Sequence, residues 1–220
     1  MNVISKNVLN TQQEHWENTF LEPDAFGESP SYAGRKSLET MRRCGVSVML
    51  ELGSGQGRDT FLFARNGLDV TAGDYTKRGI EAIMEKAERL QVSEKVHGKC
   101  ADVRKPLPFE DETFDACYSH MLLCMALEMT EIESLVKEIG RVLKPNGLCI
   151  FTVRNTSDPH YGAGIHHGED MYEVDGFIVQ FYDREKVERL ARDYETLSVE
   201  EFQEGKMPRS LYLVTMRKKR

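Results

Sequence analysis

From Val46 onward, short apolar runs alternate with longer amphipathic stretches along the chain. The short runs predict strands, and the stretches with apolar residues at helical spacing predict helices. We expect strands at 46–52, 68–73, 96–101, 114–119 and 148–153, and helices at 58–65, 77–90, 130–143 and 183–191. This alternation is typical of a parallel sheet with helices on both faces, so we predict an α/β, doubly wound fold.

Two late apolar segments complete the predicted sheet. Residues 196–202 and 210–216 are expected to pair antiparallel, which makes the sheet seven-stranded, mostly parallel and Rossmann-like. By contrast, the stretch from Arg154 to Asp175 is polar, with several glycines and histidines. We therefore expect a long polar loop between the fifth strand and the last helix.

The region ahead of the first strand, up to about Cys44, is helical and loop-like. It cannot belong to the alternating sheet, so it must pack over an edge of the sheet or over a site. We predict an N-terminal helical cap or lid at residues 1–45 and one α/β domain at residues 46–220.

Composition and net charge limit the binding partners and the cellular compartment that we expect. The chain has 220 residues, 40% of them apolar and 30% charged, which fits a globular protein of one domain. No stretch approaches the roughly 20 apolar residues of a membrane span, and no signal peptide is visible. The net charge of −7 argues against nucleic acid as the main partner. We expect a cytoplasmic monomer or homodimer without membrane contact, in which the five cysteines are free thiols.

A glycine-rich turn follows the first predicted strand, with the sequence Glu51-Leu52-Gly53-Ser54-Gly55-Gln56-Gly57. Glycines at the carboxyl end of a strand let the backbone come close to a ligand. The dinucleotide fingerprint G-x-G-x-x-G would need a glycine or a small residue at position 58, where this chain has Arg58. The spacing therefore disfavours a nicotinamide oxidoreductase.

Two acidic residues follow the next two predicted strands. Asp74 ends the second strand, where a carboxylate can accept hydrogen bonds from both ribose hydroxyls. Tyr75 offers an aromatic ring to an adenine, and Asp102 after the third strand can accept from the adenine amino group. Together with the glycine-rich turn, these residues indicate a nucleoside-containing cofactor.

Residues 48–153 resemble class I S-adenosylmethionine-dependent methyltransferases in the ELGSGQG turn, the GDY and ADV acids and the RVLKPNG segment. The stretch GQGRDTFLFARNGLDV is similar to small tellurite-resistance and thiopurine-type methyltransferases, and HWENTFLEPDAFGESPS resembles their N-terminal cap. The resemblance implies S-adenosylmethionine as cofactor. It further implies cofactor contacts from Glu51, Gly53, Ser54, Gly55, Gly57, Asp74, Tyr75, Asp102, Val103 and Ser119.

In such a fold the methyl acceptor reacts over the end of the fourth strand, here Tyr118-Ser119-His120. A general base is needed only if the nucleophile carries a proton at working pH. His120 is the candidate base because imidazole titrates near neutrality, and Tyr118 is a second catalytic candidate. The alternative for His120 is a residue that closes over the cofactor or hydrogen-bonds a strand end.

The candidates for substrate contact lie in the N-terminal region and in the loop after the fifth strand. They are Trp16, Tyr32, Arg154, His160, Tyr161 and His166. A metal site built from His160, His166, His167 and Glu169 has no spacing typical of known metal sites, so we expect no bound metal.

Four functions are weighed. The first is a methyltransferase acting on a small molecule, with a soft nucleophile such as a thiol, a chalcogen or a metalloid oxyanion. The second keeps the cofactor and methylates oxygen or nitrogen with His120 as base. The third is a non-catalytic S-adenosylmethionine-binding protein, and the fourth is the nicotinamide oxidoreductase that Arg58 disfavours.

Overall fold

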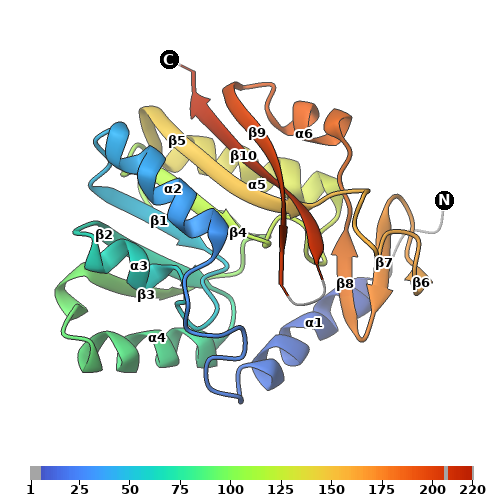
Figure 1. Cartoon of the computed structure of the whole chain (residues 1–220), viewed down its shortest axis with the longest axis horizontal. Coiled ribbons are helices and arrows are strands. Elements are labelled where there is room, and N and C mark those ends of the chain that lie inside the picture. Colours follow the sequence, from blue (N-terminus) through green and yellow to red (C-terminus); the bar gives the residue numbers. More distant parts are fainter. Residues whose placement is uncertain (1–5, 206–207, 220) are drawn as a thin grey trace.

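The computed structural model describes residues 6–205 and 208–219 and places a seven-stranded sheet at the centre of the molecule (Figure 1). The strand order is β3-β2-β1-β4-β5-β10-β9, and all neighbours are parallel except those of β10. The predicted fold class and the antiparallel pair at the end of the chain are confirmed. The strands are β1 (Val48–Leu52), β2 (Asp69–Asp74), β3 (Val96–Cys100), β4 (Phe114–His120), β5 (Leu143–Arg154), β9 (Tyr194–Glu204) and β10 (Arg209–Lys218).

Helices cover both faces of the sheet, because its central strands are apolar on both sides. One core cluster joins α2, α3 and α4 to one face, and a second cluster joins α5 and α6 to the other. The helices are α1 (Lys6–Thr19), α2 (Tyr32–Arg43), α3 (Thr60–Arg65), α4 (Lys77–Arg89), α5 (Met129–Val142) and α6 (Arg184–Leu190), with a short 3₁₀ turn η1 (Ser93–Lys95) before β3. Among the described residues, no helix is long and apolar enough to cross a membrane.

The stretch from Arg154 to Asp175 is not one long loop, and that prediction was wrong. It contains β6 (Ile165–His166) and β7 (Met171–Val174), which form a three-stranded antiparallel sheet with β8 (Phe177–Gln180). A two-residue turn, Asp175-Gly176, joins β7 to β8 with φ values of 54° and 79°. Asp-Gly is the pair that favours a tight hairpin turn, and it is the local signal that the polar composition obscured.

The N-terminal region forms two helices ahead of β1, in agreement with the expected helical cap. Helix α2 packs on the sheet beside α3, whereas α1 lies across the end of the sheet beneath β8 (Figure 1). The Gln12 side chain joins α1 to the hairpin, donating to Gly176 O at 3.0 Å and accepting from Ile178 N at 3.4 Å. The structure thus brings α1 and the β7–β8 hairpin together over the carboxyl ends of the parallel strands.

Candidate cofactor and acceptor site

The strand order reverses between β1 and β4, and ligands of open α/β sheets bind at such a point. The glycine-rich turn lies there. Gly53 has a φ of 71°, and a Cβ on it would come within 2.9 Å of Leu122 Cβ. The backbone N–H groups of Gly53 and Ser54 both donate to Gly73 O, at 2.8 and 3.1 Å. The turn is therefore fixed to β2 and leaves room only for bare backbone at position 53.

Asp74 lies at the end of β2 and is almost fully buried. Its Oδ2 accepts from Gly55 N at 2.9 Å, and its Oδ1 accepts from Thr76 N at 2.9 Å and from Thr76 Oγ1 at 2.7 Å. Burial raises the pKa of this carboxyl, against these hydrogen bonds, which lower it. An ionised carboxylate offers about four acceptor positions, so Asp74 holds the turn and keeps capacity for a ribose hydroxyl.

Asp102, after β3, is paired with a residue that sequence reasoning missed. Both of its oxygens accept from the Arg104 guanidinium, each at 2.9 Å. Burial alone would raise the pKa of Asp102, but the hydrogen bonds and charge of Arg104 lower it. Tyr75 lies close enough for its hydroxyl to interact electrostatically with both residues. The structure thus brings Tyr75, Asp102 and Arg104 together, and Val103 packs beside them against the core.

Three predicted cofactor residues differ in how they are engaged. The Glu51 carboxyl is fully buried and accepts from Thr60 Oγ1. Burial, reinforced by the nearby charge of Asp59, raises the pKa of Glu51 to about 8. Ser54 Oγ donates to Gly73 O at 3.3 Å. Ser119 Oγ is buried and has no hydrogen-bond partner among the described residues. A bare glycine turn, anchored carboxylates and an orphaned hydroxyl at one sheet edge together fit an adenosyl cofactor.

The region predicted as a lid lies directly on the glycine-rich turn. A Cβ on Gly55 would come within 3.2 Å of Phe20 Cζ, and Gln56 bonds to the backbone of Phe20, Glu22 and Ala25. Trp16 packs in an aromatic cluster with Phe20, Phe26, Phe177 and His15. This cluster links the glycine-rich turn to the β7–β8 hairpin through aromatic side chains.

His120 lies at the end of β4, as predicted, but both ring nitrogens are engaged. Nδ1 lies 3.0 Å from Thr152 Oγ1, and Nε2 lies 3.1 Å from Glu204 Oε2. Glu204 Oε1 in turn accepts from Tyr32 N at 3.0 Å. Burial alone would raise the pKa of Glu204, but the hydrogen bond and charge of His120 lower it to about 2. The acceptor end of the site therefore carries an ordered imidazole–carboxylate pair.

Tyr118 and Tyr32 are engaged by side chains that no local pattern in the sequence indicated. Tyr118 is fully buried, and its hydroxyl donates to Asp59 Oδ2 at 2.8 Å within a network that includes Ser31. The Tyr32 ring packs on Phe202, and its hydroxyl bonds to a glutamate on β9. Both hydroxyls are thus bonded to carboxyl groups, and the Tyr32 backbone N–H bonds to Glu204.

Arg154 ends β5 and forms a buried ion pair with Asp158, in which two guanidinium nitrogens meet the two carboxylate oxygens. Asp158 also accepts from Ser210 N at 2.9 Å and His160 N at 2.9 Å. The pair fixes the chain where it leaves the sheet. Arg154 also packs its guanidinium over the Phe181 ring, 5.2 Å from its centroid. This geometry gives Arg154 a structural role at the edge of the site.

The remaining predicted substrate residues lie between β5 and β7, on or before the small sheet. His166 is exposed and stacks on Tyr172, while the Tyr161 hydroxyl donates to Asp170 at 2.9 Å. His160 is only half-buried. In the described part of the chain, no group of three or more histidine, cysteine or acidic side chains is arranged to hold a metal ion.

Two residues at this end of the molecule had no sequence signal. The Gln180 backbone N–H donates to Cys124 O in the loop after β4. The Gln180 side chain is fully buried, and neither of its amide atoms has a partner among the described residues. Arg209, the first residue of β10, is half-buried beside Met121. Cys124 itself is buried, and burial raises the pKa of its thiol to about 11, which disfavours a thiolate role.

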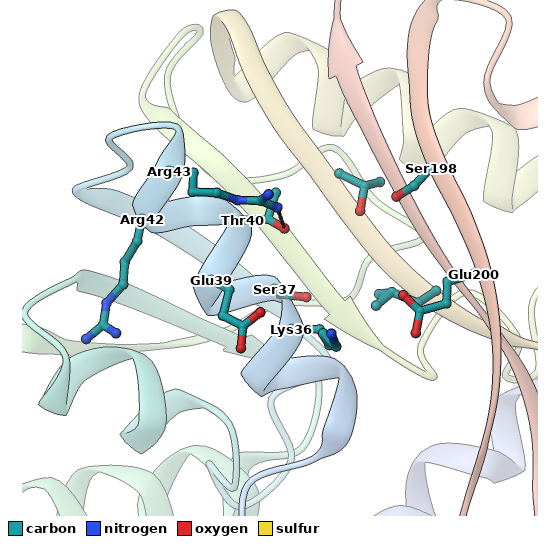
Figure 2. A pocket seen from close by; sticks show the side chains of 10 residues that line it. Lys36, Ser37, Glu39, Thr40, Arg42, Arg43, Ser198 and Glu200 are labelled. Carbon is teal, nitrogen blue, oxygen red and sulfur yellow. Dashed lines mark hydrogen bonds between the residues drawn. The ribbon is translucent and has the colours of Figure 1, made fainter.

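A separate groove lies between α2 and the strands β9 and β10 (Figure 2). Its lining includes Lys36, Glu39 and Arg43 from α2 and Ser198 and Glu200 from β9. None of the lining residues belongs to the glycine-rich turn or to the carboxyl ends of the parallel strands. The groove is therefore distinct from the site described above.

The comparisons with known proteins match this geometry. A family model described as a methyltransferase domain matches residues 50–151, which span the glycine-rich turn, both acids and β4 to β5. This segment of the chain is therefore similar to methyltransferase domains. Two proteins of similar fold, a Burkholderia thailandensis N1-methyltransferase and the N-methyltransferase NodS from Bradyrhizobium japonicum, were solved with S-adenosylhomocysteine, the product of the cofactor predicted from the sequence. The resemblance to methyltransferases drawn from the sequence is confirmed for these residues.

Three known proteins are similar to this chain, one in sequence and two in fold. A sterol 4-C-methyltransferase of Caenorhabditis elegans is 29% identical over 158 residues, which are 64% of this chain and 46% of that protein. A Burkholderia thailandensis 1,6-didemethyltoxoflavin-N1-methyltransferase structure superposes with a TM-score of 0.77 at 17% identity, covering 98% of this chain and 90% of that one. TehB from Haemophilus influenzae gives a TM-score of 0.65 at 16% identity, covering 84% and 62%. The structural likenesses show the fold, and the chain spans less than half the length of the curated relatives it matches.

Proposed function

We propose that the protein transfers a methyl group from S-adenosylmethionine to a small molecule whose nucleophile needs no general base. A thiol that loses its proton to water and reacts as the thiolate, a chalcogen or a metalloid oxyanion fits this description. The observation that carries the proposal is the engagement of His120, whose Nδ1 meets Thr152 and whose Nε2 meets Glu204. An imidazole with both nitrogens occupied has no free lone pair for a substrate proton.

The cofactor supplies a methyl group on a positively charged sulfur, ready for in-line displacement. On this proposal the bare turn at Gly53 and Gly55 admits the methionine part of the cofactor. Asp74 receives the ribose hydroxyls, while Tyr75 and Asp102 lie where the adenine would be bound. Arg104 orients the Asp102 carboxylate through two hydrogen bonds, so this acid is a fixed acceptor.

The lid residues support a dry acceptor site. Trp16 and Phe20 lie between the glycine-rich turn and Phe177 of the β7–β8 hairpin, and such aromatic walls exclude water and hold reactants together. The net charge of −7 disfavours a polyanionic acceptor such as nucleic acid. The Burkholderia thailandensis relative was solved with bound 1,6-didemethyltoxoflavin and S-adenosylhomocysteine, which supports a free small molecule as acceptor.

Transfer of labelled methyl from S-adenosylmethionine to a panel of thiols, oxyanions, amines and phenols tests the proposal. We expect product from at least one thiol or oxyanion, at a rate that exceeds the rates with amines and phenols. Labelled product confined to amines or phenols would contradict the choice of nucleophile. No transfer to any acceptor, by protein that binds the cofactor, would favour a non-catalytic binding protein.

The second candidate is methylation of oxygen or nitrogen with His120 as base. The ordered pair with Glu204 favours it, because a carboxylate on one nitrogen stabilises a protonated imidazole. For this chemistry Glu204 or Thr152 would first have to release a ring nitrogen. The two candidates differ in how strongly the rate depends on His120.

A further inference from the structure

Arg209 lies at the acceptor end of the site without being part of the cofactor cradle. It is the first residue of β10 and pairs in register with Glu204 of β9. Its Nη1 lies 4.0 Å from Met121 Sδ, and Met121 directly follows His120. The guanidinium is half-buried, so it is partly withdrawn from water beside the residues where the acceptor is expected.

The carboxylates near Arg209 are committed to other partners. Asp158 is buried and holds Arg154 through both of its oxygens. Glu204 meets His120 through Oε2 and the Tyr32 N–H through Oε1. Within the described residues, no carboxylate lies within ion-pair distance of the Arg209 guanidinium.

An unpaired, half-buried guanidinium is an unusual arrangement. Arginine carries five N–H donors and no acceptor, and withdrawing a charge from water is unfavourable unless it is paired. Burial and the charges of Arg154 and Arg58 lower the pKa of Arg209, and the attraction of the already engaged Glu204 and Asp158 offsets this only in part. Most other arginines of the described chain have carboxylate partners, as Arg217 does with Glu195 at the opposite end of β10.

We propose that Arg209 binds an anionic group, a carboxylate or an inorganic oxyanion, carried by the methyl acceptor. This inference rests on the proposed function, since it assigns the acceptor to the same site. The planar fork of a guanidinium matches two oxygens of a carboxylate or an oxyanion and gives strong, charge-assisted hydrogen bonds. Bound there, the anion would supply the partner that Arg209 lacks, next to the end of β4.

The test measures anion binding by protein saturated with S-adenosylhomocysteine, so that no reaction occurs. Titration calorimetry compares benzoate with benzamide, which have nearly the same shape and differ in charge, and adds selenite as an inorganic oxyanion. Arg209→Gln removes the charge, and Arg209→Lys keeps it without the fork. Arg217→Gln is the matched control, because it removes the same side chain from the other end of the same strand.

We expect the wild-type protein to bind benzoate, selenite or both at least roughly 10-fold more tightly than benzamide, as for a charge-assisted pair. Arg209→Gln should abolish that preference, Arg209→Lys should retain part of it, and Arg217→Gln should leave it unchanged. Tighter binding of benzoate than selenite identifies an organic acid, and the reverse identifies an inorganic oxyanion. Equal binding of the three probes by wild type, or an unchanged preference in Arg209→Gln, overturns the proposal.

Binding of S-adenosylhomocysteine to each variant is measured first and separates the two claims. If the wild-type protein fails to bind S-adenosylhomocysteine, the proposed function itself is wrong. If every variant binds it with wild-type affinity and no anion preference is found, only the role of Arg209 is wrong. Thermal unfolding of each variant shows that a lost preference does not come from a lost fold.

Discussion

His120 Nε2 lies 3.1 Å from Glu204 Oε2, which joins the end of β4 to the end of β9 across two intervening strands of the sheet. With Thr152 on the other nitrogen, the imidazole is held in one orientation. We predict that His120→Ala lowers the rate of methyl transfer to a thiol by less than about 10-fold. A general base contributes roughly 10²-fold or more. A loss of that size in folded protein would mean that His120 does take the proton.

The His120–Glu204 pair should make the free energy of unfolding depend on pH. The folded-state pKa of Glu204 is about 2, below its ordinary value of 4.5, so its contribution is present above about pH 4.5 and is lost as the pH falls toward 2. We predict that the stability difference between wild type and Glu204→Gln shrinks from pH 5 to pH 2.5, as measured by urea unfolding. A difference that stays constant over this range would show that the pair does not stabilise the fold.

Glu51 should give the opposite pH dependence, with a free energy of unfolding that falls as the pH rises. Burial raises its pKa from 4.5 to about 8, so the folded protein prefers the protonated carboxyl and loses stability as the pH rises through this window. Glu51→Gln should gain at least about 1.4 kcal/mol relative to wild type between pH 5 and pH 9, the equivalent of a one-unit shift. Urea unfolding at several pH values measures the gain. Glu85→Gln, an exposed site on α4, is the control and should show no such trend.

Gly53 should be irreplaceable for cofactor binding. Gly53→Ala adds a Cβ at a φ of 71° and within 2.9 Å of Leu122 Cβ, so the turn must shift. Gly45→Ala is a matched control, because Gly45 has a φ of 70° and open space around it. Both variants should lose about 1–2 kcal/mol of stability from the strained backbone. Only Gly53→Ala should weaken S-adenosylhomocysteine binding, by 10-fold or more in calorimetry. Equal affinity in the two variants would argue against the turn as the cradle.

The buried Gln180 amide should lower the free energy of unfolding of the protein without ligand. Its amide is fully buried without a partner in the described chain, and such groups cost about 1–3 kcal/mol. Gln180→Leu, of similar size, should therefore raise the free energy of unfolding by about 1 kcal/mol. The exposed Gln203→Leu on β9 should change it by less than about 0.5 kcal/mol. Destabilisation by Gln180→Leu would mean that water satisfies the amide.

Local signals in the sequence were enough for the sheet and the cofactor turn. Apolar runs and amphipathic stretches are local patterns, so the strands from Val48 to Arg154 were predicted within a few residues, apart from the earlier start of β5. The three-stranded sheet was missed because β6 has only two residues, both exposed, and the flanking segments are polar. Only the Asp175-Gly176 turn marks it locally.

The acceptor end could not be predicted, since its contacts join residues far apart in the chain. Glu204 meets a histidine 84 residues earlier by number (204 − 120), and no spacing pattern signals such a pair. The sequence led us to expect Asp102 as a free acceptor. Nothing in the sequence indicated that Arg104, two residues later, forms two hydrogen bonds to its carboxylate. Arg209 stands out only when the structure shows that the neighbouring carboxylates are already occupied.

Titration of the protein with S-adenosylhomocysteine tests the central claim most directly, with Asp74→Asn as the comparison. Asp74 holds Gly55 and Thr76 through three hydrogen bonds and is the residue assigned to the ribose. We predict micromolar binding by the wild-type protein and a loss of at least about 10-fold in Asp74→Asn, with the fold retained. Wild-type protein that shows no binding, or an Asp74→Asn variant that binds as tightly as wild type, would contradict the cofactor site described here.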